Sequence, residues 1–121
     1  MTEQAPTQLD IRIATQEDID DLVRSRIAFS DEWHPHTDEQ RAAFDAQLRA
    51  YLPSRIASQE FVGILGYVGA DLATAVFLVT QELPATCRLP RGRSGTLLNV
   101  YTFPAHRRKG YGKQVLQVTL D

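Results

Sequence analysis

The spacing of apolar and polar residues changes along the chain, and each spacing predicts a type of element. Residues Leu9 to Ala14 alternate, with Ile11 and Ile13 on one face, which is typical of a half-buried strand. Thr15 is a good N-cap for a helix, and four apolar residues follow at helical spacing: Ile19, Leu22, Val23 and Ile27. A strand and a helix that faces the core are therefore predicted at the start of the chain.

A second helix is predicted after a polar loop from Phe29 to His36. Thr37 and Gln40 have the spacing of a capping box, and the buried stripe would be Phe44, Leu48, Tyr51 and Leu52. Pro53 lacks a backbone N–H and crowds the preceding turn. We therefore expect a kink or a stop at Pro53, with another turn over residues 54–58.

Three β-rich runs come next. Phe61–Val68 and Leu72–Gln81 are separated by Gly69-Ala70-Asp71, which predicts an antiparallel hairpin. A long connection, Leu83 to Gly95, leads to a strand over Thr96–Phe103, where a proline ends the ladder.

Length and composition predict one globular domain. The chain has 121 residues, of which 43% are hydrophobic and 23% charged, and its net charge is −2. We expect residues 1–8 to be a flexible N-terminus and residues 9–121 to form a single domain. No apolar stretch reaches the ~20 residues of a membrane span, and the single cysteine favours a reducing compartment. A cytoplasmic protein with no membrane partner is expected.

The residues Arg107-x-x-Gly110-x-Gly112 lie where the last strand gives way to a helix. A helix start exposes unpaired N–H groups and a partial positive charge, so it can bind phosphate. His106, Arg108, Lys109 and Lys113 add cations there, where they disfavour the helix unless an anion compensates them. The pattern predicts a site for a polyphosphate, although a solvated basic turn has the same composition.

The run Asn99-Val-Tyr-Thr-Phe-Pro-Ala-His-Arg-Arg-Lys-Gly-Tyr-Gly-Lys resembles the coenzyme A signature of the GCN5-related N-acetyltransferases, the GNAT family. Ile11 to Leu22 resembles the first strand and helix of that family. The resemblance implies a three-layer α+β fold, with a mixed but mostly antiparallel sheet flanked by helices. The elements predicted along the chain have the order β-α-α-β-β-β-α, which matches the first two thirds of the family fold. The strand, helix and hairpin with which family members continue are not expected in this sequence. The resemblance also implies an acetyl-CoA-dependent N-acetyltransferase that acts on an unidentified primary amine, which is a small molecule or a peptide.

The resemblance also implies site residues. The strand would contact the pantetheine arm at Val100 and Thr102. The loop would hold the pyrophosphate through Arg107, Arg108, Lys109, Gly110, Tyr111, Gly112 and Lys113.

On the acceptor side, Asp31 and Glu32 would border the pocket and favour a cationic amine, unless they are ordinary solvated charges. Asn99 would either orient the acceptor or bond a neighbouring backbone group. Thr96–Phe103 contains no carboxylate, so no catalytic acid or base is assigned. No metal site is predicted, because His34-x-His36 lacks clear partners.

Two other functions are compatible with the sequence. The chain could bind coenzyme A without catalysis, because the last elements of the family domain are missing. Alternatively, the basic stretch 88–113 could form a small nucleic-acid-binding module, although the acidic remainder of the chain argues against nucleic acid as a partner. Whether the chain is an enzyme or a binding protein, the strand 96–103 would be an exposed edge of the sheet. We therefore expect a second copy of the chain, in a homodimer, or another chain to cover this edge.

Overall fold

The computed structural model of the chain describes residues 9–88 and 90–120, the last three by their backbone alone. The predicted flexible segment 1–8 lies outside the described residues. The order of helices and strands is the predicted one. In chain order they are β1 (Leu9–Ile13), α1 (Ile19–Trp33), α2 (Asp38–Ser58), β2 (Phe61–Val68), β3 (Asp71–Glu82), β4 (Arg93–Thr102) and α3 (Tyr111–Leu120), with 3-10 turns η1 (Gln16–Asp18) and η2 (Pro104–His106).

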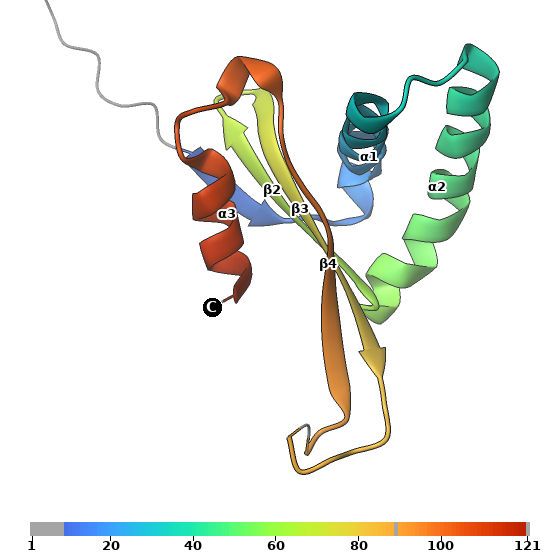
Figure 1. Cartoon of the computed structure of the whole chain (residues 1–121), viewed down its shortest axis with the longest axis vertical. Helices are drawn as coiled ribbons and strands as arrows, with labels where there is room; N and C mark the ends of the chain where they lie inside the picture. The colour runs from blue at the N-terminus through green and yellow to red at the C-terminus, as the bar shows by residue number, and fades with distance from the viewer. Residues whose placement is uncertain (1–8, 89, 121) are drawn as a thin grey trace, which may run out of the picture.

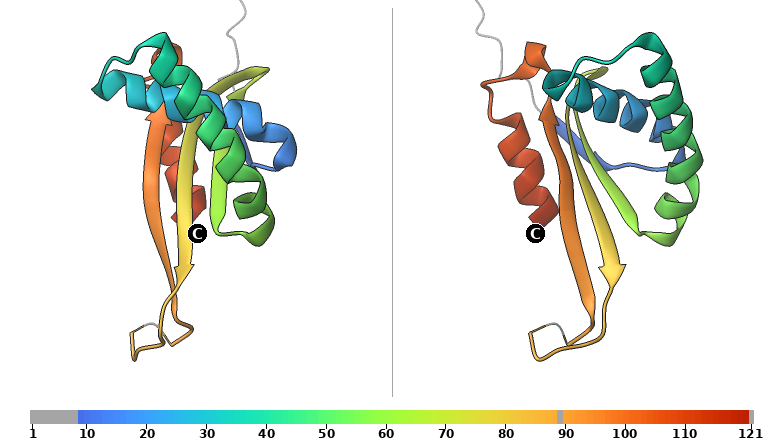
Figure 2. Two further views of the ribbon diagram at one scale, coloured as in Figure 1. Left: turned by 90° about the vertical axis from the view of Figure 1, so that its right-hand side faces the viewer. Right: turned by 45° about the vertical axis from the view of Figure 1, so that its right-hand side comes forward.

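The four strands form one antiparallel sheet in the order β1-β2-β3-β4. Helices α1 and α2 cover one face of this sheet and α3 lies on the other, so the molecule has the three predicted layers (Figures 1 and 2). The hairpin between β2 and β3 turns at Gly69, whose φ of 60° lies in the left-handed region. The α+β fold class is confirmed.

Each face of the sheet has its own core cluster. On the α1 and α2 side it contains Ala14, Leu22, Val23, Leu52, Phe61, Leu65, Leu72, Ala75 and Phe77. On the α3 side it contains Leu9, Ile64, Ala73, Val76, Tyr111 and Val115. Alternate residues of β2 and β3 enter opposite clusters, as the period of a strand requires. The sheet is therefore anchored from both sides before the chain reaches β4.

The first helix is longer than the sequence predicts. The N-cap predicted at Thr15 is confirmed at the 3-10 turn that precedes α1, where the Thr15 and Asp18 side chains each bond the other residue's backbone. The loop predicted over Phe29–His36 is wrong over its first five residues, because α1 continues to Trp33. The ring of Phe29 packs edge-on against Tyr101, with 6.3 Å between centroids, and this tertiary contact explains the extra turn. Asp31 and Glu32 are therefore helical residues rather than loop residues.

The second helix begins at the predicted capping box, with Gln40 N–H donating to Thr37 Oγ1 at 3.1 Å. Of the two alternatives at Pro53, the stop is wrong, because α2 continues to Ser58; the further turn expected over residues 54–58 is part of this helix. Proline removes one helical hydrogen bond, while Leu52 packs in the core and Ile56 packs against it. In addition, Gln16 Nε2 donates to the Pro53 carbonyl at 2.7 Å. Packing on both sides of Pro53 therefore holds the helix together, and Figure 2 shows it curving along the sheet.

Strand β4 starts earlier than predicted, at Arg93, and ends at Thr102. Its register against β3 shifts between Phe77 and Leu78, which pair with Asn99 and Leu97, so Leu98 is the extra residue of a bulge. β4 is the last strand of the sheet, so its outer edge pairs with no other strand among the described residues.

Candidate functional site: an anion-binding turn beside an open strand edge

The turn between β4 and α3 ends in a helix N-terminus with free donors. Arg108 and Gly110 have φ values of 64° and 76°, and the first helical hydrogen bond runs from Gln114 N–H to Gly110 O at 3.1 Å. The backbone N–H groups of Tyr111, Gly112 and Lys113 precede that bond, so they have no partner within the helix. A helix start with unpaired N–H groups is able to bind an anion, which is the role that the sequence predicts for this turn.

The two glycines of the turn have different surroundings. A Cβ placed on Gly110 would meet nothing within 4 Å, so this position faces open space. A Cβ on Gly112 would lie 3.1 Å from Thr102 Oγ1, so α3 approaches the strand closely at this point. The Thr102 hydroxyl is in turn 3.0 Å from that of Thr74, which donates to the Tyr101 carbonyl at 2.8 Å. These hydroxyls fix the start of α3 against the end of β4.

The outer edge of β4 supplies backbone groups next to this turn. Phe103 N–H donates inward to Ala73 O at 2.9 Å. Because inward and outward residues alternate in an antiparallel ladder, the backbone groups of Val100 and Thr102 point to the open edge. Val100 as a whole residue is also 45% exposed. The register therefore directs the backbone groups of these two residues to the outer edge of the sheet. They are the two strand positions that the family resemblance implies as contacts of the pantetheine arm.

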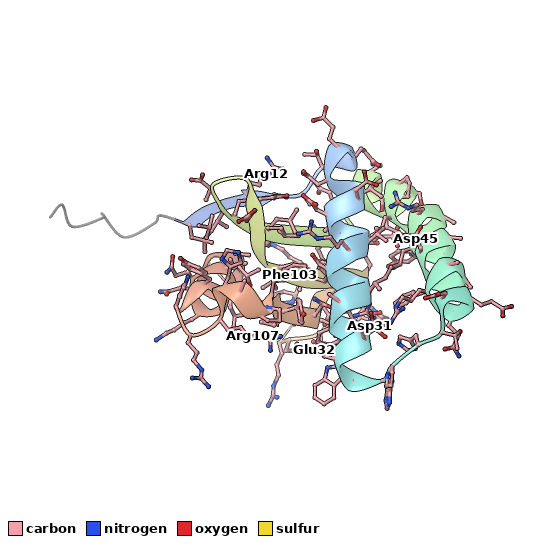
Figure 3. The ribbon with its side chains drawn as sticks, turned by 90° about the horizontal axis from the view of Figure 1, so that it is seen from above. Arg12, Asp31, Glu32, Asp45, Phe103 and Arg107 are labelled. Carbon is pink, nitrogen blue, oxygen red and sulfur yellow. The ribbon has the colours of Figure 1, made fainter. Side chains whose placement is uncertain are left out.

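Arg107 is turned away from the helix N-terminus. Its guanidinium forms an ion pair with Glu32 of α1, and its Nε donates to the Thr102 carbonyl at 2.8 Å (Figure 3). The guanidinium also lies over the Tyr101 ring, 5.5 Å from the centroid. The hydrogen bond to Glu32 raises the pKa of Arg107 above its ordinary value. Arg107 therefore links the turn to α1, and it occupies the Thr102 carbonyl at the strand edge.

The remaining predicted loop residues fall into two groups. Arg108, Lys109 and Lys113 are exposed, and none of the ion pairs among the described residues involves them. Tyr111 is only 8% exposed, and its ring packs in the core cluster under α3. Only its backbone N–H is therefore open to a ligand.

The predicted acceptor residues lie on the α1 side of β4, and their charges are already paired. Asp31 Oδ2 accepts from Arg41 Nε of α2 at 3.1 Å, and Glu32 is bound to Arg107 (Figure 3). Asn99 is 2% exposed, and its Oδ1 accepts from Arg26 Nη1 of α1 at 3.3 Å. Asp31 is therefore bound to α2, whereas Glu32 is bound to the turn before α3, and Asn99 lies beside an arginine of α1.

Sequence reasoning missed three contributors to this region: Arg26, Glu32 as the partner of Arg107, and the hydroxyl of Thr74. Each is more than 25 residues from its partner in the chain, so no local pattern connects them. The one available signal was Asn99, the single polar side chain amid the apolar residues of the strand.

The geometry fits a cofactor that carries a pyrophosphate on a polar arm. The free N–H groups at Tyr111 to Lys113 and the exposed cations suit the phosphates, and the outward backbone groups at Val100 suit an amide-containing arm. Among the described residues, no group of three or more potential ligands could hold a metal ion. In the same part of the chain, no helix has the length and apolar character needed to cross a bilayer.

Comparison with known proteins gives structural likeness only. No family model matches the chain, and no curated protein matches it. A GCN5-related N-acetyltransferase from Ralstonia eutropha JMP134 aligns with a TM-score of 0.78 at 24% identity, over 93% of this chain and 74% of that one. A predicted acetyltransferase with acetyl-CoA from Clostridium acetobutylicum aligns with a TM-score of 0.75 at 23% identity, over 93% and 71% of the two chains.

A ribosomal-protein-alanine N-acetyltransferase from Brucella melitensis biovar Abortus 2308 aligns with a TM-score of 0.66 at 18% identity, over 94% of this chain and 70% of that one. These alignments cover nearly all of this chain. The implied fold is therefore confirmed, and the protein has the fold of the GCN5-related N-acetyltransferases.

Proposed function

We propose that this protein, which has the GNAT fold, binds acetyl-coenzyme A and transfers its acetyl group to a primary amine. The observation that carries the proposal is the position of the free α3 N-terminus directly beside the open edge of β4. One ligand can reach both, with an anionic part at Tyr111 to Lys113 and a polar arm along Val100. A coenzyme A thioester has this combination of parts.

The pyrophosphate would be held by backbone groups more than by side chains. The N–H groups of Tyr111, Gly112 and Lys113 point out of the helix start, and the left-handed Gly110 clears the space before them. Arg108, Lys109 and Lys113 are exposed cations that add attraction and steer an anion toward the turn. Arg107 contributes by holding the turn, because its charge is already compensated by Glu32.

The arm of the cofactor would lie along the outward backbone groups of β4. Val100 offers both its N–H and its carbonyl there, whereas the Thr102 carbonyl already accepts from Arg107. The bound cofactor supplies an activated acyl thioester. The Val100 N–H is the candidate donor for the carbonyl oxygen of that thioester, where negative charge develops during transfer.

The acceptor would approach from the α1 side of the strand, where Asn99 and Glu32 lie. An attacking amine must be neutral, so it has to lose a proton before or during transfer. The Tyr101 ring packs against Phe29 on this side, and its hydroxyl lies 3.5 Å from Glu32 Oε1. Burial and the Glu32 charge raise the pKa of Tyr101, so this phenol stays protonated at neutral pH.

We also propose that the first half of β4 pairs with a second copy of the chain in a cytoplasmic homodimer. Leu97 and Leu98 are 41% and 42% exposed, and residues 94–98 contain no charge or proline that would discourage edge pairing. Pairing over this half leaves the edge at Val100 free for the cofactor. A cytoplasmic location agrees with the single cysteine, Cys87, which is exposed.

A thiol-release assay tests the transfer. The protein is incubated with acetyl-CoA and a panel of amines, which includes amino acids, polyamines, aminoglycosides and short peptides, and free coenzyme A is measured with a thiol reagent. We expect amine-dependent release that is absent in Gly110→Glu, which puts a carboxylate before the phosphate-binding amides. If coenzyme A binds but no amine supports release, the protein is a non-catalytic coenzyme A binder and the transferase proposal is wrong.

A further inference from the structure

Asn99 carries a buried amide nitrogen without a partner. The residue is 2% exposed, and its Nδ2 has no hydrogen-bond acceptor among the described residues. Its orientation is determined by Arg26, because a guanidinium only donates and must therefore face the amide oxygen. An unsatisfied buried donor destabilises the folded protein, so a ligand oxygen at this position would gain a donor that the protein leaves free.

Arg26 next to it is a cation without a counterion. It is partly buried between α1 and β4, and no ion pair among the described residues includes it. Burial lowers the pKa of Arg26, although the group remains charged at neutral pH. Its bond to Asn99 is long, at 3.3 Å, and joins a charged group to a neutral one. A carboxylate would be a stronger partner for Arg26 than this amide oxygen.

The acids on this side of the strand do not balance the charge of Arg26. Glu32 is bound to Arg107 and Asp31 to Arg41, so their charges are largely compensated. Arg24, two residues before Arg26, lies over the Phe103 ring at 5.0 Å. The surface between α1 and β4 therefore has a surplus of positive charge, which disfavours an acceptor that carries only ammonium groups.

We propose that Arg26 and Asn99 together bind a carboxylate of the amine acceptor, so that the acceptor is a small amino acid. This inference rests on the proposed acetyl transfer. The guanidinium would move from Asn99 Oδ1 to the carboxylate, and Asn99 Nδ2 would donate to the same group. Asn99 Oδ1 and Nδ2 are bonded to the same carbon, and the guanidinium contacts Oδ1. The guanidinium and the Nδ2 donor are therefore both within reach of one carboxylate.

The adjacency of Asn99 and Val100 limits the size of the acceptor. Asn99 faces α1, whereas the next backbone N–H, that of Val100, faces the edge where the thioester carbonyl would lie. The amine and the carboxylate of the acceptor must therefore be only a few bonds apart. In the reaction, the amine nitrogen bonds to the acyl carbon, the carbon–sulfur bond breaks, and the proton lost by the amine goes to the thiolate. The carboxylate is unchanged throughout.

A binding experiment tests the inference without turnover. N-acetylglycine, which has the carboxylate, and N-acetylglycinamide, which has a neutral amide instead, are titrated into ¹⁵N-labelled full-length chain. The Asn99 side-chain amide signals are identified by their loss in Asn99→Asp. We expect a saturable shift of these signals with N-acetylglycine, and at least about tenfold weaker binding of the amide. Equal responses to both compounds, or no response at Asn99, would overturn the inference.

Variants show whether Arg26 is responsible. Arg26→Gln and Asn99→Asp should each remove the preference for N-acetylglycine, because one deletes the cation and the other adds a competing carboxylate. Arg91→Gln removes the same charge from the exposed connection before β4, and it should keep the preference. If Arg26→Gln keeps the preference, the carboxylate is bound elsewhere and the assignment is wrong. Coenzyme A affinity, measured in parallel, should be unchanged in all three variants, so a failure of cofactor binding is detected separately.

Discussion

Arg107 and Glu32 are 75 residues apart in the chain, and their ion pair joins the turn before α3 to the end of α1. The arginine of the Arg-x-x-Gly-x-Gly pattern is therefore used to fasten the turn rather than to present a cation at the helix N-terminus. Its Nε bond to the Thr102 carbonyl, at 2.8 Å, adds a second attachment to β4. The position of the candidate anion site consequently depends on a helix from the other face of the sheet.

The salt dependence of coenzyme A binding should distinguish Arg107 from its exposed neighbours. Lys109→Gln and Lys113→Gln should each weaken binding by roughly twofold to tenfold at low salt and flatten its dependence on salt concentration, since they remove screened attraction. Arg107→Gln should weaken binding at all salt concentrations without flattening the dependence, because Glu32 already compensates its charge. Calorimetric titration at several salt concentrations measures this. A flattened dependence in Arg107→Gln would mean that the arginine contacts phosphate directly.

Two glycines offer a matched test of the turn. Gly69 and Gly110 both have positive φ, at 60° and 76°, and a Cβ on either would meet nothing within 4 Å. Gly69→Ala and Gly110→Ala should therefore each cost about 1 kcal/mol of unfolding free energy from backbone strain. Coenzyme A affinity should fall only in Gly110→Ala. An equal loss of affinity in Gly69→Ala would show that general destabilisation explains the effect.

Tyr67 should make stability depend on pH in the alkaline range. Burial and its hydrogen bond to Asp21 Oδ2, at 2.6 Å, raise the pKa of Tyr67 from 10.0 to about 12. The protonated phenol is thus favoured in the folded state. Its contribution is fully present below pH 10 and is lost as the pH rises through about 12. Urea unfolding of the wild type and Tyr67→Phe should show the wild type losing more stability across this range, and parallel pH profiles would contradict the assignment.

The proposed homodimer should depend on the first half of β4. Leu97→Lys should raise the dimer dissociation constant at least about tenfold, since a two-fold axis would bring two lysines to one edge. Ile13→Lys is the control, because Ile13 is 66% exposed on β1 at the opposite edge. Sedimentation velocity at several protein concentrations measures the effect. A wild-type chain that stays monomeric at high concentration would rule out the dimer.

The sequence predicts the elements of this fold well where local patterns are sufficient. The N-cap at Thr15, the capping box at Thr37 and the hairpin at Gly69 are complete within a few residues, and all three are confirmed. The errors concern long-range packing. The contact of Phe29 with Tyr101 extends α1, and the core residues on both sides of Pro53 carry α2 past the proline.

In the candidate site, too, local features could be predicted from the sequence and long-range contacts could not. The helix start after Gly110 could be predicted, because glycine spacing and strand composition are local. The side-chain partners could not, since Arg26, Glu32 and Thr74 reach the site only after the sheet has formed. The bulge at Leu98 also has no clear signal in the sequence, yet it belongs to the register that turns Asn99 toward α1 and Val100 toward the open edge.

Calorimetric titration with coenzyme A and with pantetheine tests the central claim most directly, because the two ligands share the arm and differ in the pyrophosphate and nucleotide. We predict micromolar binding of coenzyme A, binding of pantetheine weaker by at least about a hundredfold, and loss of coenzyme A binding in Gly110→Glu. Equal binding of the two ligands, or no binding of coenzyme A while a short oligonucleotide binds with a steep salt dependence, would contradict the account.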